Sequence, residues 1–302
     1  MVALVTMIVG TPLRHWVDRA SLRFKLRTEY EYEERKKLRV LIGSYRGQML
    51  EVAERLDHRF WNLYKNHQAG WHNVKGNYSN VSGNYYYTSW LYRFGALIAV
   101  ARKFEREAVF IDSRYAIRSD LTFVKFLKGF FWVFTDVALF DEQGYDPYRA
   151  VDHFFSDDLR KFADSLITDK GLLTYEQFQD VVKKGAVPTS IFQFFDGVTR
   201  GEQRNRWDRL VCAHLFVLAF LANFGYDMQA PRRRRFKEVA SYVENPLCLL
   251  YLRRWIPKLG LDDNKAGGWI RALTWRWEFA LTRDRLIRSM KTRLFRRQAL
   301  QT

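Results

Sequence analysis

The chain has 302 residues, of which 48% are hydrophobic and 17% aromatic, and this composition excludes an intrinsically disordered protein. Two cysteines cannot form a disulfide framework or a zinc site on their own, and only six prolines are present, which favours long helices. The formal net charge of +17 indicates an anionic partner: lipid headgroups, nucleic acid or an acidic protein.

The first 28 residues divide into an apolar and a basic part. Met1–Leu13 carries no charged side chain, and the residues that follow include Arg14, Arg19, Arg23, Lys25 and Arg27. No basic region or small-residue cleavage site marks a secretory signal, and the apolar part is shorter than the roughly 20 residues of a full membrane span. Three interpretations stay open: an interfacial or partial membrane anchor, which we favour, the end of a span cut short at this start, or an element packed in the core. Basic residues beside an anchor stay cytoplasmic, so the body is expected on the cytosolic side.

Helical periodicity dominates the next segment. Apolar residues recur at three- and four-residue steps over 29–64 and again over 85–113, which predicts two long amphipathic helices. The intervening segment 67–84 is rich in Gly, Asn and Ser and is interpreted as a loop, the best candidate for a mobile segment.

A run that is apolar nearly all round, Leu121–Phe140, predicts a helix at the centre of a bundle, because its lysines and Asp136 argue against a membrane. Further helices are expected over 148–167 and, after a capping box at Thr174–Gln177, over a short fifth segment. The phenylalanines of 192–195 are interpreted as a connector, and Gly197–Gly201 as a hinge or boundary.

Three helices are predicted in the last third of the chain: 206–226, 232–255 and 266–298. No alternating strand pattern of useful length is present. We therefore predict an all-α fold, an irregular multi-helix bundle with long helices around a central apolar helix. Its parts are an anchor and basic segment over 1–28, a helical core over 29–198, and a basic helical region over 199–302 that packs on this core.

The basic residues gather toward the C-terminus. Residues 226–302 contain 18 Lys and Arg against 7 Asp and Glu, so this segment holds 18 − 7 = 11 of the 17 excess positive charges. Cations at a helix start oppose the helix dipole, which suggests a role outside helix stability. The candidate anion, lipid or nucleic-acid contacts are Arg232, Arg233, Arg234, Arg235, Arg285, Arg288, Lys291, Arg293, Arg296 and Arg297. A solvated charged surface is the competing interpretation.

Catalytic signals are weak. His153 and Asp157 would share one face of the helix predicted over 148–167, and Asp136 would be a carboxylate in an apolar helix, so these three are minor candidates for an active site. A calcium loop is rejected for 166–177, since Leu166 and Gln177 would occupy its first and twelfth ligand positions. Nucleophile elbows, phosphate loops and zinc motifs are absent, so we expect no metal and no cofactor.

The sequence thus favours a membrane-surface-associated helical binding or regulatory protein rather than an enzyme. Its expected location is the cytoplasmic face of the plasma membrane, or the cytoplasm, and its expected partner is anionic lipid or an acidic protein. The first alternative is a nucleic-acid-binding protein that uses the same arginines, and the second is an enzyme with an unfamiliar helical site. The oligomeric state is not predicted.

Overall fold

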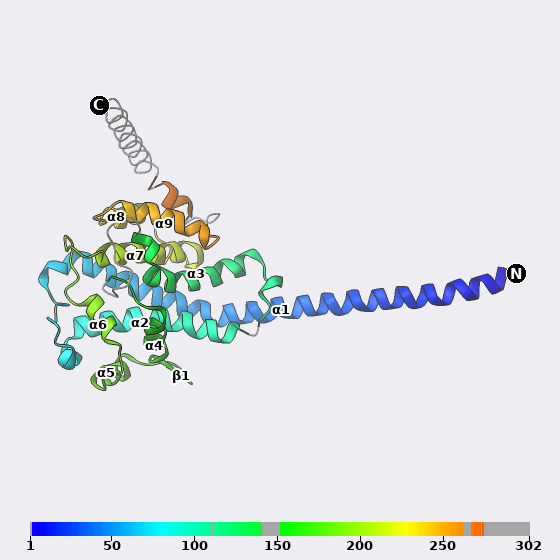
Figure 1. The fold of residues 1–302 in the computed structure, drawn as a ribbon, viewed down its shortest axis with the longest axis horizontal. Coiled ribbons are helices and arrows are strands. Elements are labelled where there is room, and N and C mark those ends of the chain that lie inside the picture. Colours follow the sequence, from blue (N-terminus) through cyan, green and yellow to red (C-terminus); the bar gives the residue numbers. More distant parts are fainter. Residues whose placement is uncertain (1, 110, 141–151, 262–266, 273, 275–302) are drawn as a thin grey trace, which may run out of the picture.

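A single helix of 65 residues, α1 (Val2–Asn66), gives the molecule its shape (Figure 1). The computed structural model describes residues 2–109, 111–140, 152–261, 267–272 and 274. The second half of α1 packs into a helical body, whereas the first half projects from it as a free arm. Side chains 16–30 are all exposed, and Glu34 and Leu38 are the first to be buried. The arm's N-terminal end lies far from the body, which is incompatible with an opening segment packed in the core.

The body consists of short and medium helices around the second half of α1. Its α-helices are α2 (Tyr85–Ala108), α3 (Arg118–Thr135), α4 (Ser156–Asp164), α5 (Tyr175–Lys183), α6 (Thr189–Phe195), α7 (Arg206–Phe224), α8 (Arg233–Ala240) and α9 (Leu247–Lys258). Single 3-10 turns occur at η1 (His67–Ala69), η2 (Tyr78–Gly83), η3 (Ser113–Tyr115) and η4 (Val137–Phe140). The strands in the described residues are β1 (Ile167–Thr168) and β2 (Gly171–Leu172), which pair as a small antiparallel hairpin. The predicted all-α bundle is therefore confirmed.

Helix α7 is the most completely buried element. All of its residues from Arg206 to Leu221 are buried, and it packs against α1, α3, α8 and α9. Phenylalanines on α3 stack edge-on against it, for example Phe130 against Phe216 at 5.2 Å between ring centroids. A side chain at Gly129 would come within 2.3 Å of the Phe216 ring, so this glycine allows α3 and α7 to approach closely. Aromatic packing of this kind explains the high aromatic content.

Among the described residues, α7 is also the one helix with the length and hydropathy of a membrane span. About nine-tenths of its apolar window, 89%, is buried inside the body. It is therefore packed as a core helix in this fold, as predicted.

Asp196 holds the Gly- and Asn-rich segment 67–84 against the body. Its carboxylate accepts hydrogen bonds from the backbone N–H of Val74 at 2.8 Å and of Gly76 at 2.8 Å, and from the Tyr78 hydroxyl at 3.1 Å. This segment contains two 3-10 turns and is a tethered connection, not the free loop that its composition suggests.

Several predicted helix boundaries are wrong. The helix expected over 29–64 is only part of α1, and the connector of 192–195 belongs to α6. Within the described part of the helix expected over 148–167, which begins at residue 152, only α4 is helical, because residues 152–155 are not. The helix expected over 232–255 is two helices, since Asp208 accepts hydrogen bonds from the backbone N–H of Glu244 and Asn245 and Pro246 follows. The capping box at Thr174 and Gln177 is confirmed.

Candidate functional site

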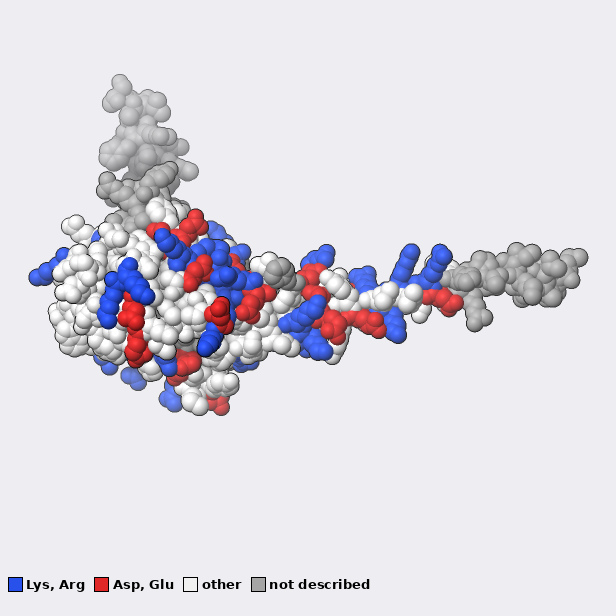
Figure 2. All heavy atoms as spheres, turned by 90° about the horizontal axis from the view of Figure 1, so that it is seen from below, with Lys and Arg blue, Asp and Glu red and all other residues white. Residues whose placement is uncertain are grey.

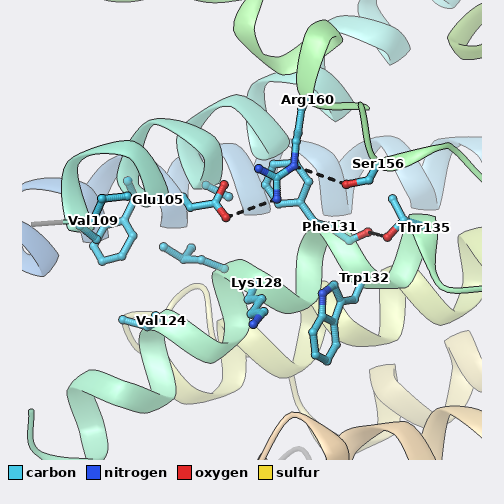
Figure 3. A pocket seen from close by; sticks show the side chains of 13 residues that line it. Glu105, Val109, Val124, Lys128, Phe131, Trp132, Thr135, Ser156 and Arg160 are labelled. Atoms are coloured by element: carbon cyan, nitrogen blue, oxygen red, sulfur yellow. Dashed lines mark hydrogen bonds and ion pairs between the residues drawn. The ribbon is translucent and has the colours of Figure 1, made fainter. Parts of the chain in front are cut away.

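A pocket of about 300 Å³ lies between α2, α3 and α4 (Figure 3). Its floor is apolar and consists of Ala101, Phe104, Ala108, Val124, Leu127 and Phe131. Such a volume is at the lower end of the range for small-molecule sites, about 300–1,000 Å³. We name this site the α2–α3–α4 pocket.

The spacing of residues on α3 explains why this pocket forms. Val124, Leu127, Lys128, Phe131 and Thr135 follow one another at three- and four-residue steps, so they line one face of the helix. The opposite face carries the phenylalanines that pack on α7. The facing stretch of α2 has alanines at 101 and 108, whose small side chains leave space that the α3 side chains do not fill.

Polar groups occupy the rim of the pocket on two sides (Figure 3). On the α2 and α4 side, Glu105 pairs with Arg102 at 2.7 Å and with Arg160 at 3.5 Å, and Arg160 also donates to the Ser156 hydroxyl at 3.4 Å. On the α3 side, the Lys128 ammonium lies 5.0 Å from the centre of the Trp132 ring. No carboxylate pairs with Lys128 among the described residues.

The three minor catalytic candidates do not share a helix face. Asp136 ends α3, where its carboxylate accepts hydrogen bonds from the backbone N–H of Ala138 at 2.8 Å and from the Trp255 indole at 2.9 Å. His153 is buried and precedes α4, whereas Asp157 is exposed in the first turn of that helix. The i,i+4 relation expected of His153 and Asp157 is therefore wrong, because the backbone is not helical at His153.

A buried arginine joins the two segments that carry these candidates. The Arg209 guanidinium donates to the backbone carbonyls of Asp152, Val133 at 2.8 Å and Asp136 at 3.0 Å, and it lies 4.7 Å from the Phe140 ring. Its side chain is fully buried. The residues around Asp136 and His153 are thus brought together by a structural cation that sequence reasoning did not single out.

The predicted basic contacts have different environments. Arg235 is half-buried, pairs with Asp57 at 2.6 Å and lies over the Trp61 ring. Arg232, Arg233 and Arg234 are exposed and have no ion pair within the part of the chain that the structure describes. The remaining predicted contacts, Arg285, Arg288, Lys291, Arg293, Arg296 and Arg297, lie outside the described residues.

Asp57 belongs to a buried polar network that the sequence analysis also missed. Its carboxylate accepts hydrogen bonds from His214 Nε2 at 2.7 Å, from Arg235 Nη2 at 2.6 Å and from the Trp61 indole at 3.1 Å. His214 Nδ1 lies 3.1 Å from the Tyr64 hydroxyl, which donates to it when the imidazole is neutral. The available signal was His214, a histidine within the apolar run of 210–224, whereas Asp57 lies among charged residues and gave no such signal. Since Asp57 and His214 are sealed from solvent, this network supports the fold and is not open to a substrate.

Four histidines affect the pH dependence of stability in the same direction because they are at least partly buried. It lowers the pKa of His214, His72, His153 and His67 below their ordinary value of 6.5, and desolvation is the largest cause in each case. Below pH 6.5 the unfolded chain therefore binds more protons than the folded chain, and stability is lost as the pH falls. Burial also raises the pKa of Glu202 and Asp208, so these carboxyl groups act in the opposite direction and favour the folded state as the pH falls through their raised pKa toward the ordinary values of 4.5 and 3.8. The histidines of the unfolded chain take up protons near pH 6.5, so the four histidines set the trend around that pH.

We therefore expect the free energy of unfolding to fall between pH 7.5 and about pH 5.5. Urea unfolding at fixed ionic strength over this range measures the effect. His214→Gln keeps a donor near Asp57 but does not titrate, so it should flatten the dependence on pH. An identical pH dependence in wild type and variant would show that His214 does not contribute.

No group of three metal-ligating side chains occurs in residues 2–109, 111–140, 152–261, 267–272 and 274. The α2–α3–α4 pocket has an apolar floor and a charged rim, a combination that is common in small-molecule sites. Comparison of the chain with protein-family models, with curated proteins and with solved structures found no match.

Proposed function

We propose that this chain is a helical binding protein held at an anionic membrane surface by the arm of α1, with its body on the cytosolic side. The observation that supports this proposal most is the exposure of large apolar side chains on the arm. Trp16 is 70% exposed and Phe24 is 73% exposed. Monomeric soluble proteins seldom leave a series of such side chains in water, and Trp is enriched where a helix meets a membrane interface.

The order of charges along the arm supports the same proposal. Residues 1–13 are uncharged, and residues 14–28 contain five basic residues and one acidic residue. Arg19 and Arg23 have no ion pair among the described residues, whereas Lys25 and Arg27 pair with Glu29 and Glu31 farther along the helix. Figure 2 shows basic and acidic side chains along the arm outside the body. Unpaired cations next to an apolar segment favour contact with anionic headgroups.

The length of α1 places residues 2–13 far from the basic cluster at the start of α8, which consists of Arg232, Arg233 and Arg234. Residue 13 lies about 25 Å along the helix from Tyr30, where the arm reaches Tyr115 of the body. It lies about 65 Å from Asp57, which binds Arg235. These distances far exceed the screening length of about 8 Å at physiological salt. An upright arm would therefore keep Arg232, Arg233 and Arg234 free for a separate anionic partner.

Vesicle co-sedimentation tests the proposal. The full chain should bind vesicles that contain phosphatidylserine, and deletion of residues 1–13 should abolish this binding. The double variant Arg19→Gln/Arg23→Gln should bind these vesicles about 30-fold more weakly, since each basic residue near an anionic surface contributes about 1 kcal/mol. Binding to pure phosphatidylcholine should be the same for this variant and the wild type.

A matched variant separates the arm from the α8 cluster. Arg232→Gln/Arg233→Gln also removes two exposed cations, but it should leave vesicle binding unchanged when the arm stands upright. Equal losses in both double variants would instead indicate an arm that lies along the surface. A full chain that stays in solution with anionic vesicles at low salt would refute membrane attachment.

Nucleic-acid binding is the rival function for the α8 arginines, and salt titration distinguishes it. Nucleic-acid affinity should fall steeply and linearly on a logarithmic salt scale, whereas attachment through residues 1–13 should persist in part at high salt. Retention of the chain on DNA, with loss in Arg232→Gln/Arg233→Gln, would favour the rival.

A further inference from the structure

We infer that the α2–α3–α4 pocket binds a single-chain amphiphile with a carboxylate head, its chain on the apolar floor and its head at Lys128. The inference is independent of membrane attachment, because no residue of the arm contributes to the pocket.

The floor of the pocket selects the apolar part of the ligand. It combines two alanines, two aliphatic side chains and the rings of Phe104 and Phe131. Hydrophobic transfer from water is worth about 0.8 kcal/mol for each buried CH₂ group. A volume of about 300 Å³ suits one alkyl chain or one ring system, and it is too small for both chains of a phospholipid. At the mouth, Val109 is 71% exposed and extends the apolar surface outward.

The charges on the rim select the head of the ligand. Arg160 is already engaged by Glu105 and Ser156, and Arg102 pairs with Glu105 and Asp164, so the cations on this side of the rim already have partners within the protein. Lys128 has no ion pair among the described residues, and its ammonium lies over the face of the Trp132 ring, an interaction worth about 0.5–1 kcal/mol at an exposed site. A carboxylate offers the ammonium a stronger, charge-assisted hydrogen bond.

The position of Lys128 also places the head at the mouth of the pocket. Its side chain is exposed, whereas Leu127 and Phe131 on the same helix are buried beneath it. Figure 3 shows Lys128 and Trp132 on the α3 side and Glu105, Arg160 and Ser156 on the other. A ligand with its chain on the floor would therefore expose its head to water and to Lys128, as an amphiphile requires.

Two ligands with the same chain test this inference: dodecanoate and dodecanol. Binding of each to the full chain is measured by displacement of a fluorescent fatty acid, below the concentration at which micelles form. Lys128→Met should weaken dodecanoate about 2- to 5-fold and leave dodecanol unchanged, because only the carboxylate has a charged bond to lose and an exposed ion pair contributes at most about 1 kcal/mol. Lys125→Met is the matched control, since this lysine of α3 donates to the Gly260 carbonyl outside the pocket; it should leave both affinities unchanged.

A second variant tests the location of the chain. Ala108 is half-buried at the floor, so Ala108→Phe should fill the pocket and abolish binding of both ligands. Its unfolding in urea should stay close to that of the wild type, which separates a filled pocket from a misfolded chain. The inference is overturned when neither ligand binds the wild type, when Lys128→Met weakens both equally, or when folded Ala108→Phe binds as tightly as the wild type. Deletion of residues 1–13 should leave dodecanoate affinity unchanged, so a failure of membrane attachment is distinguishable from a failure of this site.

Discussion

Replacement of Asp57 by alanine should destabilise the folded chain by about 3–5 kcal/mol. The carboxylate is almost fully buried and accepts hydrogen bonds from three donors on three different helical segments: His214 on α7, Arg235 on α8 and Trp61 on α1 itself. Alanine would leave these donors without an acceptor, including one charged guanidinium, and the cost of an unpaired buried donor exceeds the gain from the original bond. Urea unfolding at pH 7.5 measures the loss as a lower midpoint at unchanged slope.

Glu51→Ala provides a control on the same helix. Glu51 is also a carboxylate paired with an arginine, Arg55 at 2.6 Å, but both side chains are 58% exposed. Because an exposed pair contributes about 0–1 kcal/mol, this substitution should cost little. Similar losses in Asp57→Ala and Glu51→Ala would show that the buried network does not hold α1, α7 and α8 together.

Asp57→Asn separates the shape of the side chain from its charge. The amide keeps one oxygen acceptor but loses the negative charge that faces Arg235 and His214, so it should cost less than alanine. It should also make the folded state more sensitive to acid. Protonated His214 would then face Arg235 without a carboxylate between them, and this repulsion would destabilise the fold. A larger fall in stability for Asp57→Asn than for wild type between pH 7.5 and about pH 5.5 would reveal this coupling.

Sequence patterns predicted most of the helices because packing follows their periodicity. The apolar stripe from Leu38 to Leu63 is buried as expected, and the apolar run of 210–224 forms the core helix α7. Residues 2–28 show no single apolar face, so periodicity alone did not predict that α1 continues through them. Their helix-favouring residues, mainly Arg, Leu and Ala, were the available signal.

Other errors had a visible cause in the sequence. Pro246 lies inside the helix expected over 232–255, and a proline in a helix interior removes a hydrogen bond, so a break there was predictable. The end of α3 at Thr135 was harder to predict, because the apolar run continues to Phe140. The cause of this break is a tertiary contact: the Asp136 carboxylate accepts a hydrogen bond from the Trp255 indole of α9.

The pocket could not be predicted at all. Its residues come from α2, α3 and α4, and each segment by itself resembles the core face of an ordinary amphipathic helix. Only the relative position of the three helices shows that Lys128 lines a cavity and that Arg160 already pairs with Glu105.

Substitution of Arg209 by leucine should cost about 3 kcal/mol, because three backbone carbonyls, two of them buried and one partly buried, would each lose a charged donor. These carbonyls belong to Val133 and Asp136 at the end of α3 and to Asp152 before α4, so the guanidinium joins the same two segments as the backbone hydrogen bond from Phe154 N–H to the Phe134 carbonyl. Leucine matches the apolar part of the side chain and its contact with Phe140, but it supplies no donor. The resulting loss is measured by urea unfolding.

Two further variants test whether the stabilisation requires the guanidinium group, with its several N–H donors. Arg209→Lys retains the positive charge but concentrates its donors on one nitrogen, so it should recover only part of the stability. Arg46→Leu is the control: this exposed arginine donates to one carbonyl, that of Phe224 at 2.9 Å, and its loss should cost less than about 1 kcal/mol. Full recovery in Arg209→Lys would mean that charge alone stabilises the end of α3. Equal costs for Arg209→Leu and Arg46→Leu would mean that the three carbonyls do not depend on Arg209. The end of α3 and the segment before α4 would then be held by the backbone hydrogen bond from Phe154 N–H to the Phe134 carbonyl and by the surrounding phenylalanines.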